Sequence, residues 1–174
     1  RIFKIRIIFH DRNLRAMLNL KNVENLKLQT LPIDGFIPEI LGALEKHNQI
    51  ILVAPPGTGK TTRVPWAVLD SLWKKGLTNE EVIVLEPRKL AAKMTALRVS
   101  EERGLKIGGD VGYQFRGERQ GGTSTRLWYY TEGVLLRRLL SDPMLKGVNT
   151  VILDEFHERH INTDLALALI NHLQ

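Results

Sequence analysis

The sequence predicts an α/β protein: a mostly parallel, doubly wound sheet with helices on both faces. Short apolar runs of strand length alternate with longer amphipathic segments, which is the pattern of repeated β-α units. Two polar motifs directly follow two of these runs, at residues 54–62 and 154–159. Because parallel strands place their carboxyl ends at one edge of a sheet, we expect both motifs at that edge.

Apolar runs and their punctuation define the elements of the first half. A short helix is expected over residues 40–46, and a buried strand over residues 50–53, where four aliphatic residues follow one another. The next helix opens with the end of the first motif and extends towards residue 75. It tolerates Pro65 in its first turns, and Gly76 ends it.

The second half repeats this alternation. In chain order we expect a strand at 82–85, a helix at 90–102, a loop-rich stretch between Gly108 and Gly122, a strand at 127–130, a leucine-rich helix before Asp142, a strand at 151–154 and a helix at 165–173. One face of the leucine-rich helix should carry Leu135, Leu136, Leu139 and Leu140, and the other Arg137 and Arg138. The chain reaches Gln174 directly after a helix, where such a sheet normally continues, so we expect a domain truncated at its C-terminal end.

Length and composition exclude several classes of protein. The 174 residues suffice for one α/β domain but not for two. The absence of cysteine excludes disulfides and thiolate metal sites, and it fits a reducing compartment. The longest apolar runs have about half a dozen residues, far short of the roughly 20 that a transmembrane helix needs. These features favour a cytoplasmic protein with no membrane segment.

Residues 1–27 form a basic N-terminal extension ahead of the domain, which we place at residues 28–174. The extension has seven Lys and Arg against two Asp and Glu, whereas the remainder has eighteen against seventeen, so the net charge of +6 says little about the domain. Phe3, Ile5, Ile7 and Phe9 alternate like one face of a strand, and Leu14, Met17 and Leu18 have helical spacing. Three interpretations stay open, with the last two favoured: a basic arm for nucleic acid, an accessory packing element, or sequence upstream of a natural start at Met17.

The motif at residues 54–62 has the pattern of a phosphate-binding loop between a strand and a helix. Its glycines can adopt backbone angles closed to other residues, so successive N–H groups turn towards an anion at the start of the helix. Lys60 supplies a charge for the β and γ phosphates, and the Thr61 hydroxyl can ligate Mg²⁺. Ala54 stands where the general pattern has Gly, but a small residue meets the same steric need. The predicted phosphate site comprises Gly57, Thr58, Gly59, Lys60, Thr61 and Thr62.

The motif at residues 154–159 places two carboxylates at the end of another apolar strand. Asp154 is expected to hold Mg²⁺ through water, and Glu155 is expected at the same metal and as the base that orients the attacking water. His157 is expected to hydrogen-bond across the nucleotide site, whereas His160 is interpreted as a surface or packing histidine. Alone, these acids would favour a solvated turn; together with the phosphate loop they favour a site for catalysis.

Further segments of the chain complete a family pattern. These are Leu85-Glu86-Pro87-Arg88-Lys89-Leu90-Ala91-Ala92, Val111-Gly112-Tyr113, Thr131-Glu132-Gly133-Val134-Leu135, and Asp142-Pro143 with Gly147-Val148. With the two motifs above, they give six matches in order over about 140 residues. From about residue 31 to residue 174 the chain thereby resembles the first RecA-like domain, a P-loop NTPase fold, of the superfamily 2 DEAH-box helicases. It resembles most closely their bacterial HrpB-type branch.

The resemblance implies roles that spacing alone does not give. Arg88, Lys89 and Thr131 lie where the family contacts the nucleic-acid backbone, and Arg98 lies where an arginine stacks on adenine. Lys89 departs from the arginine usual at its position, which keeps the charge but loses bidentate phosphate geometry. The cofactors would be ATP and Mg²⁺, and the partner single-stranded nucleic acid, with RNA favoured over DNA. We interpret the aromatic residues 128–130 as strand core and not as a platform for stacked bases.

The implied activity is that of an ATP-dependent RNA helicase, which couples ATP hydrolysis to translocation on nucleic acid or to its unwinding. It requires a second RecA-like domain with arginine fingers, which this chain lacks, so little or no turnover is expected from the fragment alone. Two alternatives stay open: a DNA-directed superfamily 2 translocase, and a non-catalytic nucleic-acid-binding module on the same fold.

Overall fold

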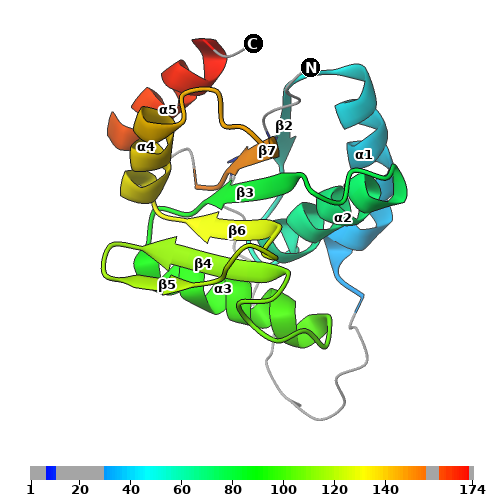
Figure 1. The fold of residues 1–174 in the computed structure, drawn as a ribbon. Helices are drawn as coiled ribbons and strands as arrows, with labels where there is room; N and C mark the ends of the chain where they lie inside the picture. The colour runs from blue at the N-terminus through cyan, green and yellow to red at the C-terminus, as the bar shows by residue number, and fades with distance from the viewer. Residues whose placement is uncertain (1–6, 11–29, 156–160, 173–174) are drawn as a thin grey trace.

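The computed structural model describes residues 7–10, 30–155 and 161–172 (Figure 1). Its strands are β1 (Ile7–His10), β2 (Ile50–Val53), β3 (Glu81–Leu85), β4 (Val111–Phe115), β5 (Glu118–Gln120), β6 (Leu127–Tyr130) and β7 (Val148–Leu153). Its helices are the 3₁₀ turn η1 (Pro32–Phe36), α1 (Ile37–Lys46), α2 (Lys60–Lys74), α3 (Lys89–Glu102), α4 (Glu132–Ser141) and α5 (Ile161–His172). None of the described helices has both the length and the hydrophobicity needed to span a lipid bilayer.

The strands form a single sheet in the order β2-β1-β7-β3-β6-β4-β5. Every neighbouring pair is parallel except β4 and β5, which form an antiparallel hairpin at one edge. A mostly parallel sheet of this kind needs cover on both faces, because its strands are apolar on both sides. The predicted α/β fold with a mostly parallel sheet is confirmed.

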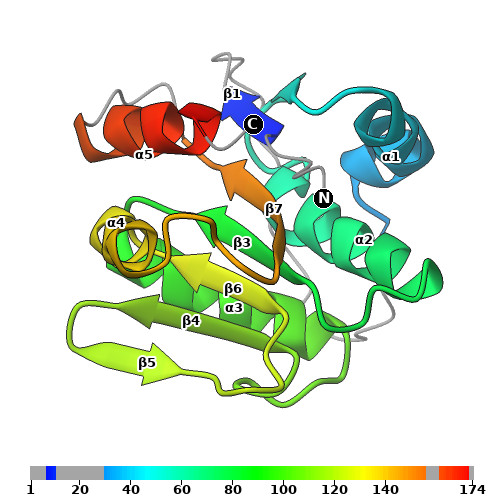
Figure 2. The same ribbon diagram turned by 45° about the horizontal axis from the view of Figure 1, so that its top comes forward.

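Two hydrophobic cores lie on the two faces of the sheet. Along β3, Val82 and Val84 pack with α1, α2 and α3, whereas Ile83 and Leu85 pack with α4 and α5. Figures 1 and 2 show the same division, with α1 to α3 on one side of the sheet and α4 and α5 on the other. This alternation follows from the period of two along a strand. The sheet is thus the middle of three layers.

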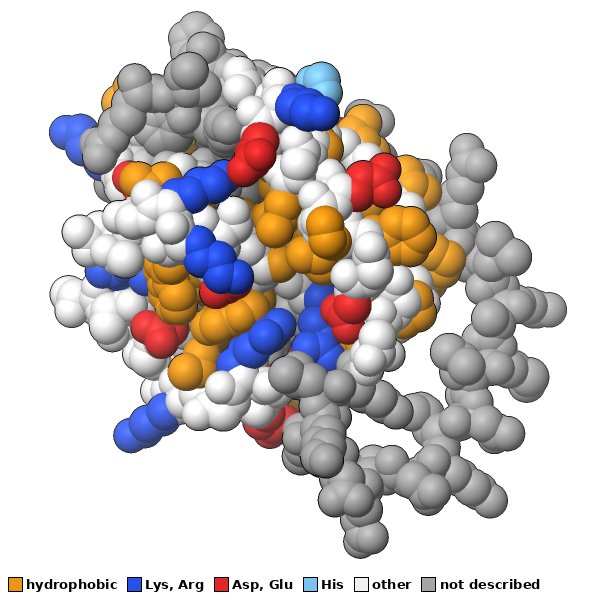
Figure 3. Space-filling model, turned by 90° about the vertical axis from the view of Figure 1, so that its right-hand side faces the viewer, with side chains coloured by type: hydrophobic (Ala, Val, Ile, Leu, Met, Phe, Trp, Pro, Cys, Tyr) orange, Lys and Arg blue, Asp and Glu red, His pale blue; other side chains and the backbone are white. Residues whose placement is uncertain are grey.

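The prediction of a fully buried strand is wrong for β2. This strand lies at the edge of the sheet, and its outward-facing Ile51 and Val53 are 69% and 52% exposed. Ile50 and Leu52 pack against the core on the side of α1 and α2. A hollow of about 690 Å³ lies between β2 and the segment of η1 and α1. The face of the molecule seen in Figure 3 shows hydrophobic side chains gathered among acidic and basic ones.

Three other expectations need correction. The stretch between Gly108 and Gly122 is not a loop alone, because it contains β4 and β5 around a turn at Gly117 with φ +95°. In α4, Leu135 and Leu139 are buried, but Leu140 is 80% exposed, so the four leucines do not share one buried face. Helix α5 begins at Ile161 and not at residue 165. Its first turn was missed because three of its four residues are polar and give no apolar periodicity.

The strand β1 comes from the N-terminal extension and lies inside the sheet. It pairs in parallel with β2 along four residues, from Ile7 opposite Ile50 to His10 opposite Val53. On its other side Ile7 and Ile8 pair with β7. The predicted strand of residues 3–9 is therefore present from residue 7. Its earlier residues, and the helical spacing at residues 14–18, lie outside the described part of the chain.

Close packing at the hairpin yields a stability prediction. A Cβ at Gly112 would lie 2.5 Å from the backbone carbonyl oxygen of Gln120 and 3.2 Å from the Trp128 ring. Because backbone atoms of a paired strand cannot easily move, Gly112→Ala should lower the free energy of unfolding by about 1–3 kcal/mol in chemical denaturation. Gly122→Ala is the matched control, since nothing lies within 4 Å of its Cβ. Equal stability of both variants would contradict this packing.

Candidate functional site

The phosphate-loop motif lies between β2 and α2, as its sequence predicts. The chain leaves β2 at Val53, turns through residues 54–59 and enters α2 at Lys60. Gly57 and Gly59 have φ values of +76° and +92°, in the region that favours glycine. The first turn of α2 is closed by the N–H groups of Thr62 and Arg63, which donate to the Gly59 carbonyl at 3.2 and 2.8 Å. The loop therefore has the backbone of an anion-binding turn at a helix start.

Crowding around Gly59 is a second reason why this position is occupied by glycine. A Cβ there would lie 2.5 Å from Cδ1 of Leu31 and 3.3 Å from Cγ of Arg63. The approach segment is also tied to the loop by a backbone hydrogen bond from Ile33 N–H to the Thr58 carbonyl, at 3.2 Å. Lys60 is buried, with 6% of its surface exposed. The loop is thus held by packing against Leu31 and Arg63 and by the backbone hydrogen bond from Ile33.

A short hydrogen bond joins the two predicted motifs. The Thr61 hydroxyl donates to Oδ2 of Asp154 at 2.5 Å, and the Glu155 N–H donates to Oδ1 of Asp154 at 2.8 Å. Asp154 is 2% exposed, and its own N–H donates to the Leu85 carbonyl of the neighbouring strand at 3.0 Å. Glu155 has a φ of +50°, so the chain turns sharply after the strand. The fold therefore brings residues 61 and 154 together from distant parts of the chain.

The oxygen atoms at this junction suit a magnesium ion. Mg²⁺ prefers oxygen ligands and is usually held by one or two carboxylates, with water and substrate phosphate completing six positions. Thr61 supplies a hydroxyl and Asp154 a carboxylate in direct contact. Among the described residues no group of three or more His, Cys, Asp or Glu could hold a metal by itself. The donor set therefore fits an ion that arrives with a phosphate ligand, and not one caged by protein alone.

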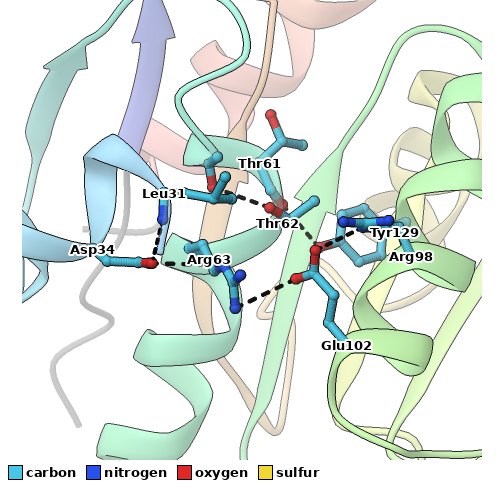
Figure 4. Close-up of polar contacts among 9 residues, drawn as sticks. Leu31, Asp34, Thr61, Thr62, Arg63, Arg98, Glu102 and Tyr129 are labelled. Atoms are coloured by element: carbon cyan, nitrogen blue, oxygen red, sulfur yellow. Dashed lines mark hydrogen bonds and ion pairs between the residues drawn. The ribbon is translucent and has the colours of Figure 1, made fainter. Parts of the chain in front are cut away.

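Tyr129 supports the start of α2 from the middle of the sheet. Its hydroxyl donates to the Thr61 carbonyl at 2.9 Å, and its ring is fully buried (Figure 4). Burial raises the pKa of Tyr129 well above its ordinary value, and the nearby Asp154, Glu86 and Glu102 add to this shift. The hydroxyl thus remains a donor. The prediction that residues 128–130 are strand core is confirmed, but the polar contact of Tyr129 could not be read from the sequence.

Glu86 is a further carboxyl group at this edge that sequence analysis did not single out. It directly follows β3 and is 5% exposed. Burial raises its pKa from 4.5 to about 8, and the negative charges of Asp154 and Glu155 contribute to the rise. Because Leu85 pairs with Leu153 in parallel register, the residues after them lie side by side. That register, once β3 and β7 are known to be neighbours, is the signal that could have identified Glu86.

A cavity of about 290 Å³ lies between the phosphate loop and α3. Gly57, Gly59, Lys60, Thr61 and Thr62 line it from the loop, and Leu31, Arg98 and Glu102 line it from outside the loop. Arg98 is therefore placed at the cavity together with most of the predicted phosphate site. The Thr58 hydroxyl instead donates to the Pro55 carbonyl at 2.9 Å, within the loop. His157 and His160 lie outside the described residues.

The residues expected to contact nucleic acid lie after β3 and β6. Arg88 and Lys89 are exposed at the start of α3, and the Lys89 ammonium lies 6.0 Å from the centre of the Phe115 ring. Thr131 is only 9% exposed and precedes α4, where its carbonyl accepts hydrogen bonds from Val134 and Leu135. It borders a groove of about 1160 Å³ between the β4–β5 hairpin and α4. All three residues lie at the same edge of the sheet as the two motifs.

Comparisons with known proteins and protein families identify the family to which this chain belongs. A protein-family model described as DEAD/DEAH box helicase matches residues 35–171. The chain belongs to the DEAD/DEAH box helicase family. The match begins after β1 and includes both motifs, so most of the candidate site lies within it.

Relatives with established names agree with the family match. The chain is 46% identical over 147 residues to the ATP-dependent RNA helicase HrpB of Escherichia coli (strain K12), which covers 84% of this chain and 18% of HrpB. It is 41% identical over 149 residues to human ATP-dependent RNA helicase DHX30, which covers 83% of this chain and 12% of DHX30. The chain thus spans less than a fifth of the length of these curated relatives.

Solved structures show the same fold. A crystal structure of the E. coli DEAH/RHA helicase HrpB superposes with a TM-score of 0.76 at 46% identity, over 83% of this chain and 18% of that chain. A crystal structure of the E. coli DExH-box NTPase HrpB gives 0.77 at 45% identity, over 86% and 18%. The RecA-like fold and the similarity to HrpB that the sequence motifs implied are confirmed.

The buried carboxyl of Glu86 gives a prediction for stability against pH. Its pKa is about 8 in the folded protein against an ordinary value of 4.5, so between these values the folded state holds a proton that the unfolded state has released. Stability should therefore fall as the pH rises from about 4.5 to 8. Glu86→Gln removes this fall, and its free energy of unfolding relative to wild type should rise by about 1–3 kcal/mol across that interval.

Urea unfolding at several pH values without divalent cations measures this difference. Glu39→Gln serves as the control, because Glu39 is exposed at the start of α1 and should leave the pH profile parallel to wild type. A Glu86→Gln profile that stays parallel to wild type would show that Glu86 is ionised in the folded protein.

Proposed function

We propose that this chain is the ATP-binding domain of an ATP-dependent RNA helicase, in which ATP hydrolysis drives movement along nucleic acid or its unwinding. The observation that carries the proposal is the contact between Thr61 and Asp154, because it joins a phosphate loop to an acidic motif. An ordinary Gly-rich turn between a strand and a helix does not require a hydrogen bond to a buried carboxylate at the end of another strand. The names of the relatives, both ATP-dependent RNA helicases, support the same assignment.

Each loop residue has a defined task in this proposal. The N–H groups of Gly57, Thr58 and Gly59 face the phosphates, with the positive end of α2 behind them. The buried Lys60 places its charge at the β and γ phosphates. Thr61 and Asp154 are the ligands of Mg²⁺, Asp154 through water. Thr62, whose hydroxyl donates to the Gly59 carbonyl at 3.2 Å, closes the first turn of the helix around the phosphates.

The chemical step falls to the acidic motif. Mg²⁺ held by Thr61 and Asp154 would neutralise part of the charge that develops on the phosphates during hydrolysis. Glu155 is the base that orients the attacking water and accepts its proton, and it completes the metal site beside Asp154. The role assigned to His157, which lies outside the described residues, is a hydrogen bond across the nucleotide site.

Nucleic acid binds at the same sheet edge in this proposal. Arg88, Lys89 and Thr131 contact the sugar-phosphate backbone of a single strand, so that affinity depends on salt and little on sequence. RNA is favoured over DNA because both named relatives act on RNA. A second RecA-like domain would close over the nucleotide and the strand and supply arginine fingers. We place the protein in the cytoplasm.

Nucleotide binding is the first test. A fluorescent adenine nucleotide should bind the chain in an Mg²⁺-dependent manner, and Lys60→Ala should weaken binding at least about tenfold, because a charge-assisted contact with the phosphates is lost. Lys106→Ala, at an exposed position, is the matched control. Fluorescence anisotropy measures both. Binding that Lys60→Ala leaves unchanged, or a folded chain that binds no nucleotide, would contradict the proposal.

Hydrolysis by the isolated chain should stay at background. Arginine fingers, which in this proposal come from a second RecA-like domain, typically contribute about 10³–10⁵ in rate. A phosphate-release assay on the purified chain, beside Lys60→Ala, measures this. Turnover that is present in the wild type and absent from the variant would show that the chain is self-sufficient.

Single-stranded RNA binding tests the nucleic-acid side. The double variant Arg88→Ala/Lys89→Ala should bind RNA of any sequence more weakly. Its negative slope of log affinity against log salt should become less steep by about 1.4, because the loss of two phosphate contacts means that fewer counterions are released. Lys74→Ala is the control, since its exposed ammonium lies at the far end of α2. Competition with the matched DNA strand separates an RNA-directed from a DNA-directed protein. RNA affinity without nucleotide affinity would indicate a non-catalytic binding module.

A further inference from the structure

A network of charged side chains runs along the cavity beside the phosphate loop (Figure 4). The Arg98 Nε donates to Oε1 of Glu102 at 2.6 Å, one turn further along α3. The other oxygen of Glu102 lies 3.4 Å from Nη1 of Arg63 in α2. Arg63 Nε in turn lies 3.7 Å from the carboxylate of Asp34 in η1. Three separate elements are therefore connected through one buried carboxylate.

Glu102 is the centre of this network. Its side chain is 6% exposed, although it carries a charge, and each of its oxygens faces a different arginine. A buried carboxylate is strongly destabilising unless it is paired, so its position is fixed by the two guanidinium groups. Arg63 is also buried, at 5% exposure, which adds to this constraint. Glu102 thus has few alternative positions.

Arg98 differs from its partners because its side chain is 54% exposed at the cavity. A free arginine in this setting would sample many rotamers. The hydrogen bond to Glu102 holds one edge of its guanidinium group, and therefore sets the direction in which the flat face points. A planar cation held in this way suits a stacked aromatic ring, since guanidinium groups stack on aromatic faces.

The opposite side of the cavity is apolar and is held by the same network. Leu31 packs on Gly59 of the phosphate loop, and its N–H donates to Oδ2 of Asp34 at 2.8 Å. Figure 4 shows Leu31 and Arg98 on opposite sides of the start of α2, with Arg63 and Glu102 between them. The apolar side chain and the guanidinium face thus flank the space that adjoins the phosphate site.

We propose that Glu102 is a positioning residue for the nucleoside base of a bound nucleotide. Through Arg98 it sets a stacking surface for the base, and through Arg63 and Asp34 it links this surface to Leu31 on the other side. The base is then recognised by its face, whereas the loop recognises the triphosphate. This inference rests on the proposed nucleotide-binding function and concerns Glu102, Arg63 and Leu31, which the motif pattern does not assign.

The alternative is that Glu102 only stabilises α3, since Arg98 and Glu102 are spaced by four residues on one helix. The two roles differ in what they do to ligands. Inorganic tripolyphosphate carries the phosphates of ATP without the base, so a positioning role should change the affinity for ATP and leave that for tripolyphosphate unchanged. A role in stability alone should leave the ratio of the two affinities unaltered.

The test measures the dissociation constants of Mg²⁺-ATP and Mg²⁺-tripolyphosphate by calorimetry on the whole chain. Glu102→Gln keeps the shape of the side chain and removes its charge. It should weaken ATP binding about fivefold, the scale of a partly exposed cation–π contact, with tripolyphosphate changed less than about twofold. Glu101→Gln is the matched control, because Glu101 is the exposed neighbour on the same helix. An unchanged ratio in Glu102→Gln overturns the inference.

Two further variants keep the test decisive if Glu102→Gln folds poorly. Arg98→Lys keeps the charge at an exposed position and loses the planar face. It should therefore lower the ratio of ATP affinity to tripolyphosphate affinity in the same way. In the Arg98→Ala background, Glu102→Gln should weaken ATP binding less than it does in the wild-type background, since part of its effect acts through Arg98. Additive effects would overturn the inference. A folded wild type that binds neither ligand would refute the proposed function itself, and the inference with it.

Discussion

The hydrogen bond between the Thr61 hydroxyl and the Asp154 carboxylate is the contact on which the site depends. It requires the backbone turn at Gly59, because α2 begins directly after this turn and carries Thr61 in its first turn. It also requires the parallel register of β3 and β7, which brings Asp154 to the sheet edge beside Leu85. The Tyr129 hydroxyl adds a third support from below. Loop, strand register and buried tyrosine thus converge on a single pair of oxygen atoms.

The electrostatics of this edge are asymmetric. Glu86, Asp154 and Glu155 concentrate acidic groups in a place with little water, and the raised pKa of Glu86 is the direct result. Lys60 and the amide groups of the loop face the same region with positive charge. Such an arrangement would discriminate between ligands by charge. The carboxylates would repel an anion that arrives alone, and the lysine would repel a cation that arrives alone. In the proposed function, a phosphate that arrives with its Mg²⁺ would satisfy both sides.

Sequence patterns predicted the parts of the molecule that depend on local chemistry. The strand cores at 82–85 and 127–130, the start of α2 and the proximity of the two motifs all follow from apolar runs, glycines and the position of each motif after a strand. Properties that arise only between elements were missed: the edge exposure of Ile51, the burial of Glu86 and the pairing of Glu102 with Arg63. Strand order decides these, and a single sequence does not state it. The β4–β5 hairpin was missed because β5 has only three residues, all of them polar, and because glycines flank both strands.

The place of β1 between β2 and β7 has a consequence for the order in which the chain folds. Ile7 pairs with Ile50 on one side and with Ile152 on the other, so this short strand joins segments that lie far apart in the sequence. Closing such long loops costs entropy before any contact compensates, and contacts of this kind form slowly. The strand can complete the sheet only after β7 has been synthesised and has found its place. During translation, β1 would therefore leave the ribosome well before it can be fixed between its two neighbours.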